Sequence, residues 1–171
     1  MNWLYTPRDI AIFLLKANFT LSDENAVLHA IWESSEHIKK EYAQDEVLFR
    51  RAVRAELDSF TQMDDETDEL EMIMRDANLS FVRRTEEEQD YIFGYFKVIR
   101  LELMYIKGKY FHKIKLRRLL RQFGYKRRSL QLVERVNNTL SELSLVPYLR
   151  GYEPCDINAI GIDDMIMIRL K

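Results

Sequence analysis

The chain has 171 residues, of which 47% are hydrophobic, and a formal net charge of −2, so it can form one large or two small globular domains. A single cysteine, Cys155, excludes an internal disulfide framework and a multi-cysteine zinc site. The first residues lack both a basic leader region and a small-residue cleavage site, and their apolar runs are too short to span a bilayer. We therefore expect a cytoplasmic protein without a membrane role.

Three helices are expected in the first part of the chain. Residues 6–9, Thr-Pro-Arg-Asp, combine a capping hydroxyl with proline at the first helical position, which predicts a helix start. Ser22-Asp23-Glu24 opens a second helix, and apolar residues at helical spacing predict a third over about 45–60. The acidic stretch 63–68 is either a loop or the first turn of a fourth helix.

A second capping box, Thr85 to Glu88, begins a long helix that we expect to stop near Gly108. The best domain boundary lies at 83–88, because the charge changes sign soon afterwards. This boundary predicts an acidic helical partner-docking region at 1–84 and a second domain at 85–171.

The C-terminal third has a different pattern. We predict a short helix over 112–123, ended by Gly124 in the left-handed conformation, and a second helix capped by Ser129. Two apolar runs, 145–149 and 165–170, predict short strands around a loop. Helix, short helix, turn, helix, strand, loop and strand is the order of a winged helix-turn-helix. The predicted fold is therefore mainly α, with a helical N-terminal region and a C-terminal winged helix-turn-helix that includes a short β-hairpin.

Charge is distributed very unevenly along the chain. Residues 97–135 hold 13 Lys and Arg but only two acids, which is a net +11, whereas residues 1–96 carry −11. A concentrated basic segment on a folded domain indicates contact with polyanions. The side chains that we expect to bind nucleic acid are Lys113, Lys115, Arg117, Arg118, Arg121, Lys126, Arg127, Arg128, Gln131 and Arg135.

We expect most of these cations on the first helix of the pair and in the turn after it. There they suit phosphate contacts, which fix the position of a protein on DNA without reading the base sequence. In the second helix, Gln131, Asn137 and Asn138 offer amides for base edges. Two other interpretations remain open: a protein-binding surface, or a solvated face that makes ion pairs with the acidic half.

The string from Leu119 to Arg128 includes the residues Phe123-Gly124-Tyr125-Lys126-Arg127-Arg128. Followed by a capped helix and a hairpin, it resembles the FGxxRR-type winged-helix modules of bacterial conflict and anti-phage proteins, over about residues 110–170. Small helical winged-helix proteins also serve as accessory subunits of SMC-like ATPase complexes. The resemblance implies a DNA-associated defence role and does not extend to residues 1–96.

Signatures of catalysis are missing from the sequence. It has no phosphate-binding GxxxxGK[ST] loop, no GxGxxG and no HExxH, so we predict no enzymatic activity, no cofactor and no metal. His29, Glu33 and His37 recur every four residues, which leaves a metal site or a solvated polar face on one helix open. Cys155 falls in the loop between the predicted strands and is interpreted as a bystander thiol.

The sequence thus predicts a non-enzymatic accessory subunit of a bacterial DNA-associated or anti-phage defence complex. Its winged helix would contact DNA phosphates with low sequence specificity. Its acidic half would dock a larger protein, with an SMC-like ATPase or a nuclease subunit as candidates. The alternatives are a stand-alone winged-helix transcription regulator, which would bind a palindrome as a dimer, and a protein-docking module without a DNA role.

Overall fold

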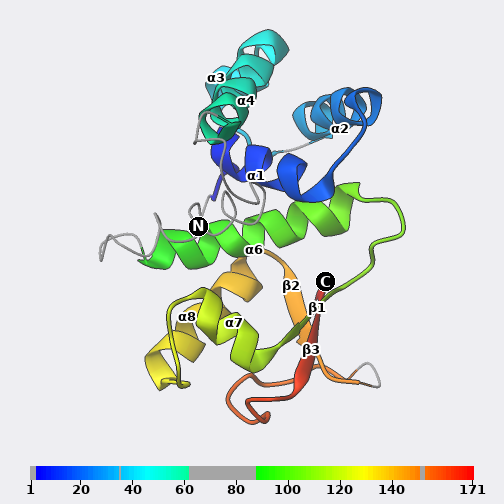
Figure 1. The fold of residues 1–171 in the computed structure, drawn as a ribbon. Coiled ribbons are helices and arrows are strands. Elements are labelled where there is room, and N and C mark those ends of the chain that lie inside the picture. The colour runs from blue at the N-terminus through cyan, green and yellow to red at the C-terminus, as the bar shows by residue number, and fades with distance from the viewer. Residues whose placement is uncertain (1–2, 35, 62–87, 151–152) are drawn as a thin grey trace. The chain divides into compact units, whose positions relative to one another are not determined.

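The computed structural model describes residues 3–34, 36–61, 88–150 and 153–171. The chain divides into two compact units, Met1–Asp76 and Ala77–Lys171, which we describe separately (Figure 1). The predicted boundary at 83–88, the start of the second capping box and the acidic stretch 63–68 lie outside the described residues or at their edge.

The first unit is helical in its described part: α1 Pro7–Ala17, α2 Leu21–Ser34, α3 Lys40–Ala43 and α4 Glu46–Thr61. The capping box of α1 is confirmed, because the Thr6 hydroxyl accepts from the Asp9 amide at 3.1 Å and the Asp9 carboxylate accepts from the Thr6 amide at 2.9 Å. The two reciprocal bonds satisfy amides that the first helical turn leaves without a partner.

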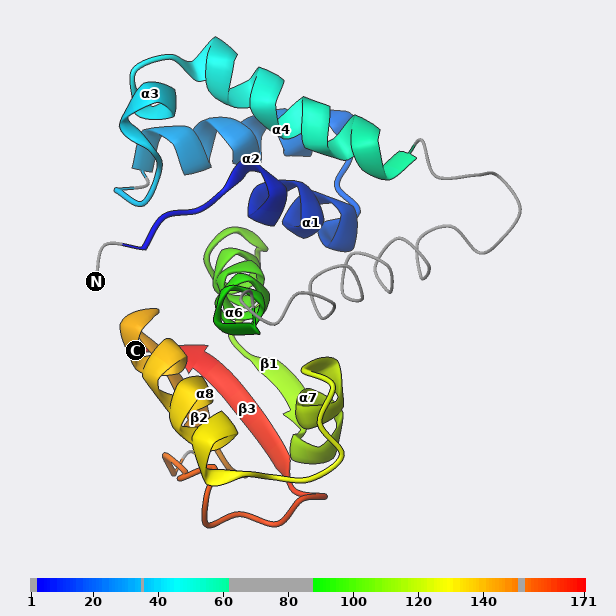
Figure 2. The same ribbon diagram turned by 90° about the vertical axis from the view of Figure 1, so that its left-hand side faces the viewer.

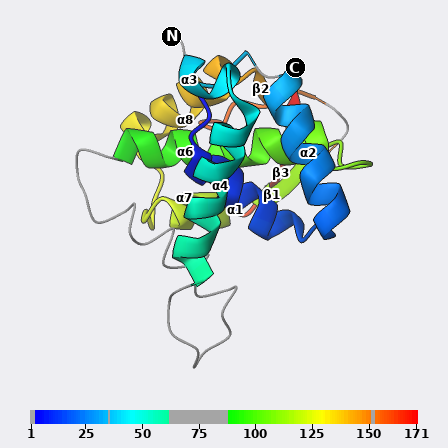
Figure 3. The same ribbon diagram turned by 90° about the horizontal axis from the view of Figure 1, so that it is seen from above.

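Helices α2 and α4 occur close to where the apolar spacing predicts them. Helix α2 begins at Leu21, one residue before the predicted start, and the Thr20 hydroxyl accepts from the Asp23 amide. Helix α4 packs against α1 and α2 (Figures 2 and 3). The core of this unit is built from fully buried side chains of the three long helices: Ile10, Phe13, Ile31, Phe49 and Val53.

The second unit contains α6 Glu88–Tyr105, β1 His112–Lys115, α7 Leu116–Gln122, α8 Leu130–Glu142, β2 Leu145–Tyr148 and β3 Met165–Leu170. The predicted long helix and the two predicted strands are present. The chain as described is therefore mainly helical, with one small antiparallel sheet of strand order β1-β3-β2.

The prediction of one helix over 112–123 is wrong in its first third. Residues 112–115 form β1, which pairs antiparallel with β3 from His112 opposite Ile168 to Lys115 opposite Met165. Only Ile114 of this strand is buried, an alternation that fits a strand with one face on the core. Helix α7 begins at Leu116, so Lys113 and Lys115 lie on the strand and not on the helix.

The connection between α7 and α8 forms as the sequence predicts. Gly124 has a φ of 79°, and its amide donates to the Arg121 carbonyl at 3.0 Å while the Tyr125 amide donates to the Leu120 carbonyl at 3.0 Å. These two bonds define a Schellman motif, which needs a left-handed residue at the glycine position. The Ser129 hydroxyl then caps α8 by accepting from the Leu132 amide at 3.2 Å.

The loop between β2 and β3 packs against the start of α7. Helix α7 has no side-chain cap, but the Leu116 amide donates to the Asp164 carbonyl at 3.0 Å and the Arg117 amide to the Ile162 carbonyl at 2.7 Å. The loop carbonyls thus replace a cap. Ile157 and Ile160 of the same loop are buried. The loop is therefore part of the core of this unit.

Candidate nucleic-acid interface

Five of the predicted cations are exposed where α7 ends and α8 begins, and one of them, Arg128, is described below with its hydrogen bonds. Arg118 and Arg121 are exposed on α7, and their spacing of three residues places them on one helix face. Lys126 and Arg127 are exposed in the turn. These four side chains, which we call the turn cations, lie within ten residues of sequence and are all exposed to solvent.

Arg117 forms an ion pair with Asp163, a contact that the sequence did not indicate. Its Nε and Nη2 donate to the two carboxylate oxygens of Asp163 at 2.7 and 2.8 Å. The hydrogen bond from Arg117 holds the pKa of the Asp163 carboxyl below its ordinary value. The bidentate geometry fixes Arg117 against the β2–β3 loop and offsets its charge.

Arg128 has a role in holding the loop. Its Nη1 donates to the carbonyls of Ile157 at 2.7 Å and Ile160 at 2.6 Å, which lie 29 and 32 residues away in sequence. These bonds join the turn after α7 to the β2–β3 loop. The sequence predicts a phosphate contact for both Arg127 and Arg128. Of these two, Arg128 is the one whose guanidinium donates to backbone carbonyls of the β2–β3 loop.

The two adjacent arginines predict opposite mutant phenotypes. Arg128→Ala should lower the free energy of unfolding by about 1.5–3 kcal/mol, because hydrogen bonds from a charged donor are lost and two carbonyls lose their partner. Arg127→Ala should change it by less than about 0.5 kcal/mol, as expected for an exposed side chain. Chemical denaturation of both variants checks this, and equal stabilities would show that the loop does not depend on Arg128.

Helix α8 has one buried and one solvated face. Leu132, Val133, Val136 and Leu140 are buried as predicted, whereas Gln131 and Asn138 are exposed and Arg135 is partly buried. The solvated face also carries Glu134 and is therefore less basic than α7. It offers amide groups rather than charge, which suits hydrogen bonding to base edges better than phosphate contact.

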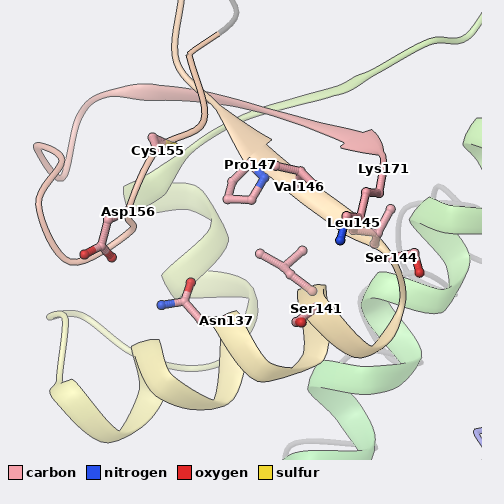
Figure 4. Close-up of a pocket in the computed structure, with 10 residues that line it drawn as sticks. Asn137, Ser141, Ser144, Leu145, Val146, Pro147, Cys155, Asp156 and Lys171 are labelled. Atoms are coloured by element: carbon pink, nitrogen blue, oxygen red, sulfur yellow. The ribbon is translucent and has the colours of Figure 1, made fainter.

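A pocket of about 330 Å³ lies between α8, β2 and the β2–β3 loop. Asn137, Ser141 and Lys171 line it together with Cys155 and Asp156 (Figure 4). Burial raises the pKa of the Cys155 thiol, and the nearby Asp156 charge raises it further. Since a reactive cysteine needs its thiolate stabilised, this environment disfavours nucleophilic chemistry.

The histidine pattern in the first unit does not form one helical face. Helix α2 ends at Ser34, and His37 beyond it stacks on Trp3 with ring centroids 3.7 Å apart. His29 contacts Glu46 through Nδ1 at 3.0 Å and lies 3.9 Å from Glu33 through Nε2. Within the described residues, no group of three or more His, Cys, Asp or Glu side chains is arranged to hold a metal ion.

None of the helices in the described ranges is both long enough and apolar enough to cross a bilayer. Comparison with known proteins finds no matching family model, no matching curated protein and no matching solved structure. The functional interpretation therefore rests on the residues and geometry of this chain.

Proposed function

We propose that the second unit is a winged helix-turn-helix domain that binds duplex DNA without strong sequence preference. The observation that carries this proposal is the element order α6-β1-α7-α8-β2-β3, combined with the sheet order β1-β3-β2 and the turn cations. In this arrangement α8 corresponds to the helix that enters the major groove, a space wide enough for one α-helix.

The role proposed for each side chain depends on whether it is exposed or already bonded to the β2–β3 loop. Arg118, Arg121, Lys126 and Arg127 would hold phosphates, and Gln131 and Asn138 on α8 would approach base edges. Arg117 and Arg128 would act mainly by fixing the β2–β3 loop, the position of the wing, beside the helix pair. Arg117 and Arg128, for which the sequence predicts phosphate contacts, would therefore stabilise the DNA-binding surface and not form part of it.

We further propose that the whole chain is a non-enzymatic subunit of a bacterial DNA-associated or anti-phage complex. The acidic helical half would dock the protein partner. Val47 and Leu48 at the start of α4 support this, because they are 66% and 39% exposed and add apolar contact to an acidic region.

The DNA proposal is tested by the salt dependence of binding to a fluorescein-labelled duplex of about two helical turns. If the four turn cations reach phosphates, log affinity should fall with log salt at a slope of about −3.6, and Lys126→Ala with Arg127→Ala should reduce the magnitude of that slope by about 1.8. The matched control is Lys39→Ala with Lys40→Ala, an adjacent exposed pair in the first unit, which should leave the slope unchanged. Absent binding at low salt, or a salt-independent affinity, would contradict the proposal.

A further inference from the structure

The two edges of the sheet differ in how their backbone groups are used. Strand β3 is central, so β1 and β2 each have one edge that β3 does not pair with. On β2, Pro147 has no amide proton to donate, and its carbonyl accepts from the Cys155 amide at 2.9 Å (Figure 4). The Leu149 amide donates to the Glu153 carbonyl at 3.1 Å. Residues 153–155 therefore occupy the edge of β2 that a further strand would need.

The alternation of hydrogen bonds between β1 and β3 determines which backbone groups of β1 point outward. The Leu116 amide donates to the Asp164 carbonyl at 3.0 Å, and these two residues continue the register of the ladder by one position. In an antiparallel pair, every second residue bonds across the ladder. Ile114, two positions before Leu116, therefore directs its backbone groups to β3. The amides and carbonyls of Lys113 and Lys115 point to the opposite side.

These outward amides and carbonyls of Lys113 and Lys115, which we call the β1 edge, are accessible to a further strand. Within the described residues, the sheet has no strand beyond β1, and no backbone hydrogen bond from another segment reaches Lys113 or Lys115. Both residues are also exposed. A strand edge with these properties is where an extended polypeptide can add to a sheet.

The chemistry of the β1 edge indicates what binds there. Its alternating amides and carbonyls match the main chain of an extended peptide, whereas the sugar-phosphate backbone of DNA has acceptors but no donors for the two carbonyls. Residues directly opposite each other in an antiparallel pair interact on one face of the sheet, so acidic residues at alternate positions would match the two lysines. A second copy of β1 is disfavoured, because it would place lysines opposite lysines.

We propose that the β1 edge binds an extended segment of a partner protein as an added antiparallel strand, with acidic residues two positions apart opposite Lys113 and Lys115. The residue between the two acids points to the other face of the sheet, on the side of the buried Ile114. Main-chain hydrogen bonds hold the segment, and the acids fix its register. The contact uses none of the turn cations and is therefore independent of the proposed DNA binding. Two residues predicted to bind nucleic acid thereby bind protein.

The test is an NMR titration of the full chain, labelled with ¹⁵N, with the end-blocked peptide Thr-Val-Glu-Val-Glu-Val-Thr at low salt, followed through the amides of Lys113 and Lys115. Methylation of the two glutamate amide nitrogens should weaken binding about tenfold or more, because these amides donate to the lysine carbonyls. Methylation of the two valines that precede the glutamates is the matched control. It should weaken binding less than about threefold, because those amides point away from β1.

The charges are tested by reversing them. Lys113→Glu with Lys115→Glu should weaken binding of the glutamate peptide about tenfold or more and should strengthen binding of the same peptide with lysines in place of its glutamates. Arg118→Glu with Arg121→Glu makes the same change in net charge on α7, and should alter the affinity for either peptide less than about twofold. Melting curves of all variants confirm that folded proteins are compared.

Three results would overturn the proposal: no saturable shift of the Lys113 and Lys115 amides, equal losses for the two methylated peptides, or an α7 variant that weakens binding as much as the β1 variant. The other occupants give results of their own. If a thymidine oligonucleotide shifts the same amides and displaces the peptide, the β1 edge is a nucleic-acid surface. If the chain forms a dimer that the peptide dissociates, the edge is a contact between copies.

Discussion

Leu120→Ala is expected to lower the free energy of unfolding of the second unit by about 2–5 kcal/mol, through lost transfer energy and the cavity that remains. Leu120 is 1% exposed on α7, close to Phe123, which is also buried. Tyr91 and Tyr95 of α6 pack edge-on against the Phe123 ring at centroid distances of 5.7 and 5.4 Å, so the region has little room to collapse.

Leu130→Ala is the matched control for this prediction, because Leu130 is the same residue type and is 83% exposed. It should change the free energy of unfolding by less than about 0.5 kcal/mol. Hydrogen exchange of the slowest amides in β3 reports the stability of this unit without a contribution from the first one. Similar effects of the two substitutions would show that the helix pair does not enclose a core.

Lys109→Met is expected to lower the free energy of unfolding by about 3 kcal/mol, because it removes a charged partner from a buried carboxylate. The Glu102 side chain is 3% exposed and forms an ion pair with Lys109, and His112 Nδ1 lies 3.7 Å from the same carboxylate oxygen. The Lys109 side chain is 31% exposed, so some water can reach the carboxylate. The expected loss in free energy of unfolding is therefore near the lower end of the range for breaking a buried ion pair.

Glu102→Gln combined with Lys109→Met should recover stability to within about 1 kcal/mol of the original, since no uncompensated buried charge remains. The matched control is Lys107→Met, the same substitution at an exposed lysine two residues away, which should be nearly neutral. Thermal unfolding of the four proteins measures the difference. A double variant as unstable as Lys109→Met would show that packing of the lysine stem, not charge, is what matters.

Local signals in the sequence predicted several helix ends, although α3 was not predicted and α7 begins four residues after its predicted start. A capping box and a first-turn proline located α1, a glycine located the end of α7, and a serine located the start of α8; each acts through bonds to residues within a few positions. Their partners are close in sequence, so the pattern alone contains the information. The local pattern also predicted β2 and β3, because their apolar runs are bounded by turn residues, although β2 pairs with residues 19 to 25 positions later in the chain.

Strand β1 was missed for the opposite reason. Residues 112–115, His-Lys-Ile-Lys, carry one apolar side chain and precede a helical run, so local spacing favours a longer helix. They are extended because they pair with residues 165–168, which lie 50 to 56 positions later in the chain. Tertiary pairing overrides local preference in such short segments.

The residues of the candidate site likewise divide into those that local sequence identifies and those whose role depends on distant residues. Sequence reasoning identified the basic segment and the exposed turn cations. It could not assign Arg117 to Asp163 or Arg128 to the carbonyls of Ile157 and Ile160, because these partners belong to a loop far along the chain. It also grouped Lys113 and Lys115 with the helix, since the change of backbone conformation at Leu116 depends on the missed strand.

The sheet order β1-β3-β2 has a consequence for synthesis on the ribosome. The central strand, β3, is the last of the three in sequence, so β1 and β2 have no shared partner until residues 165–170 have been made. Helices can form in the nascent chain, because their contacts are local, but the sheet must wait for pairings of long sequence separation. During that interval the inward side chains of β1 and β2 lack their cover, and a nascent chain stalled before β3 would be a natural substrate for holding chaperones.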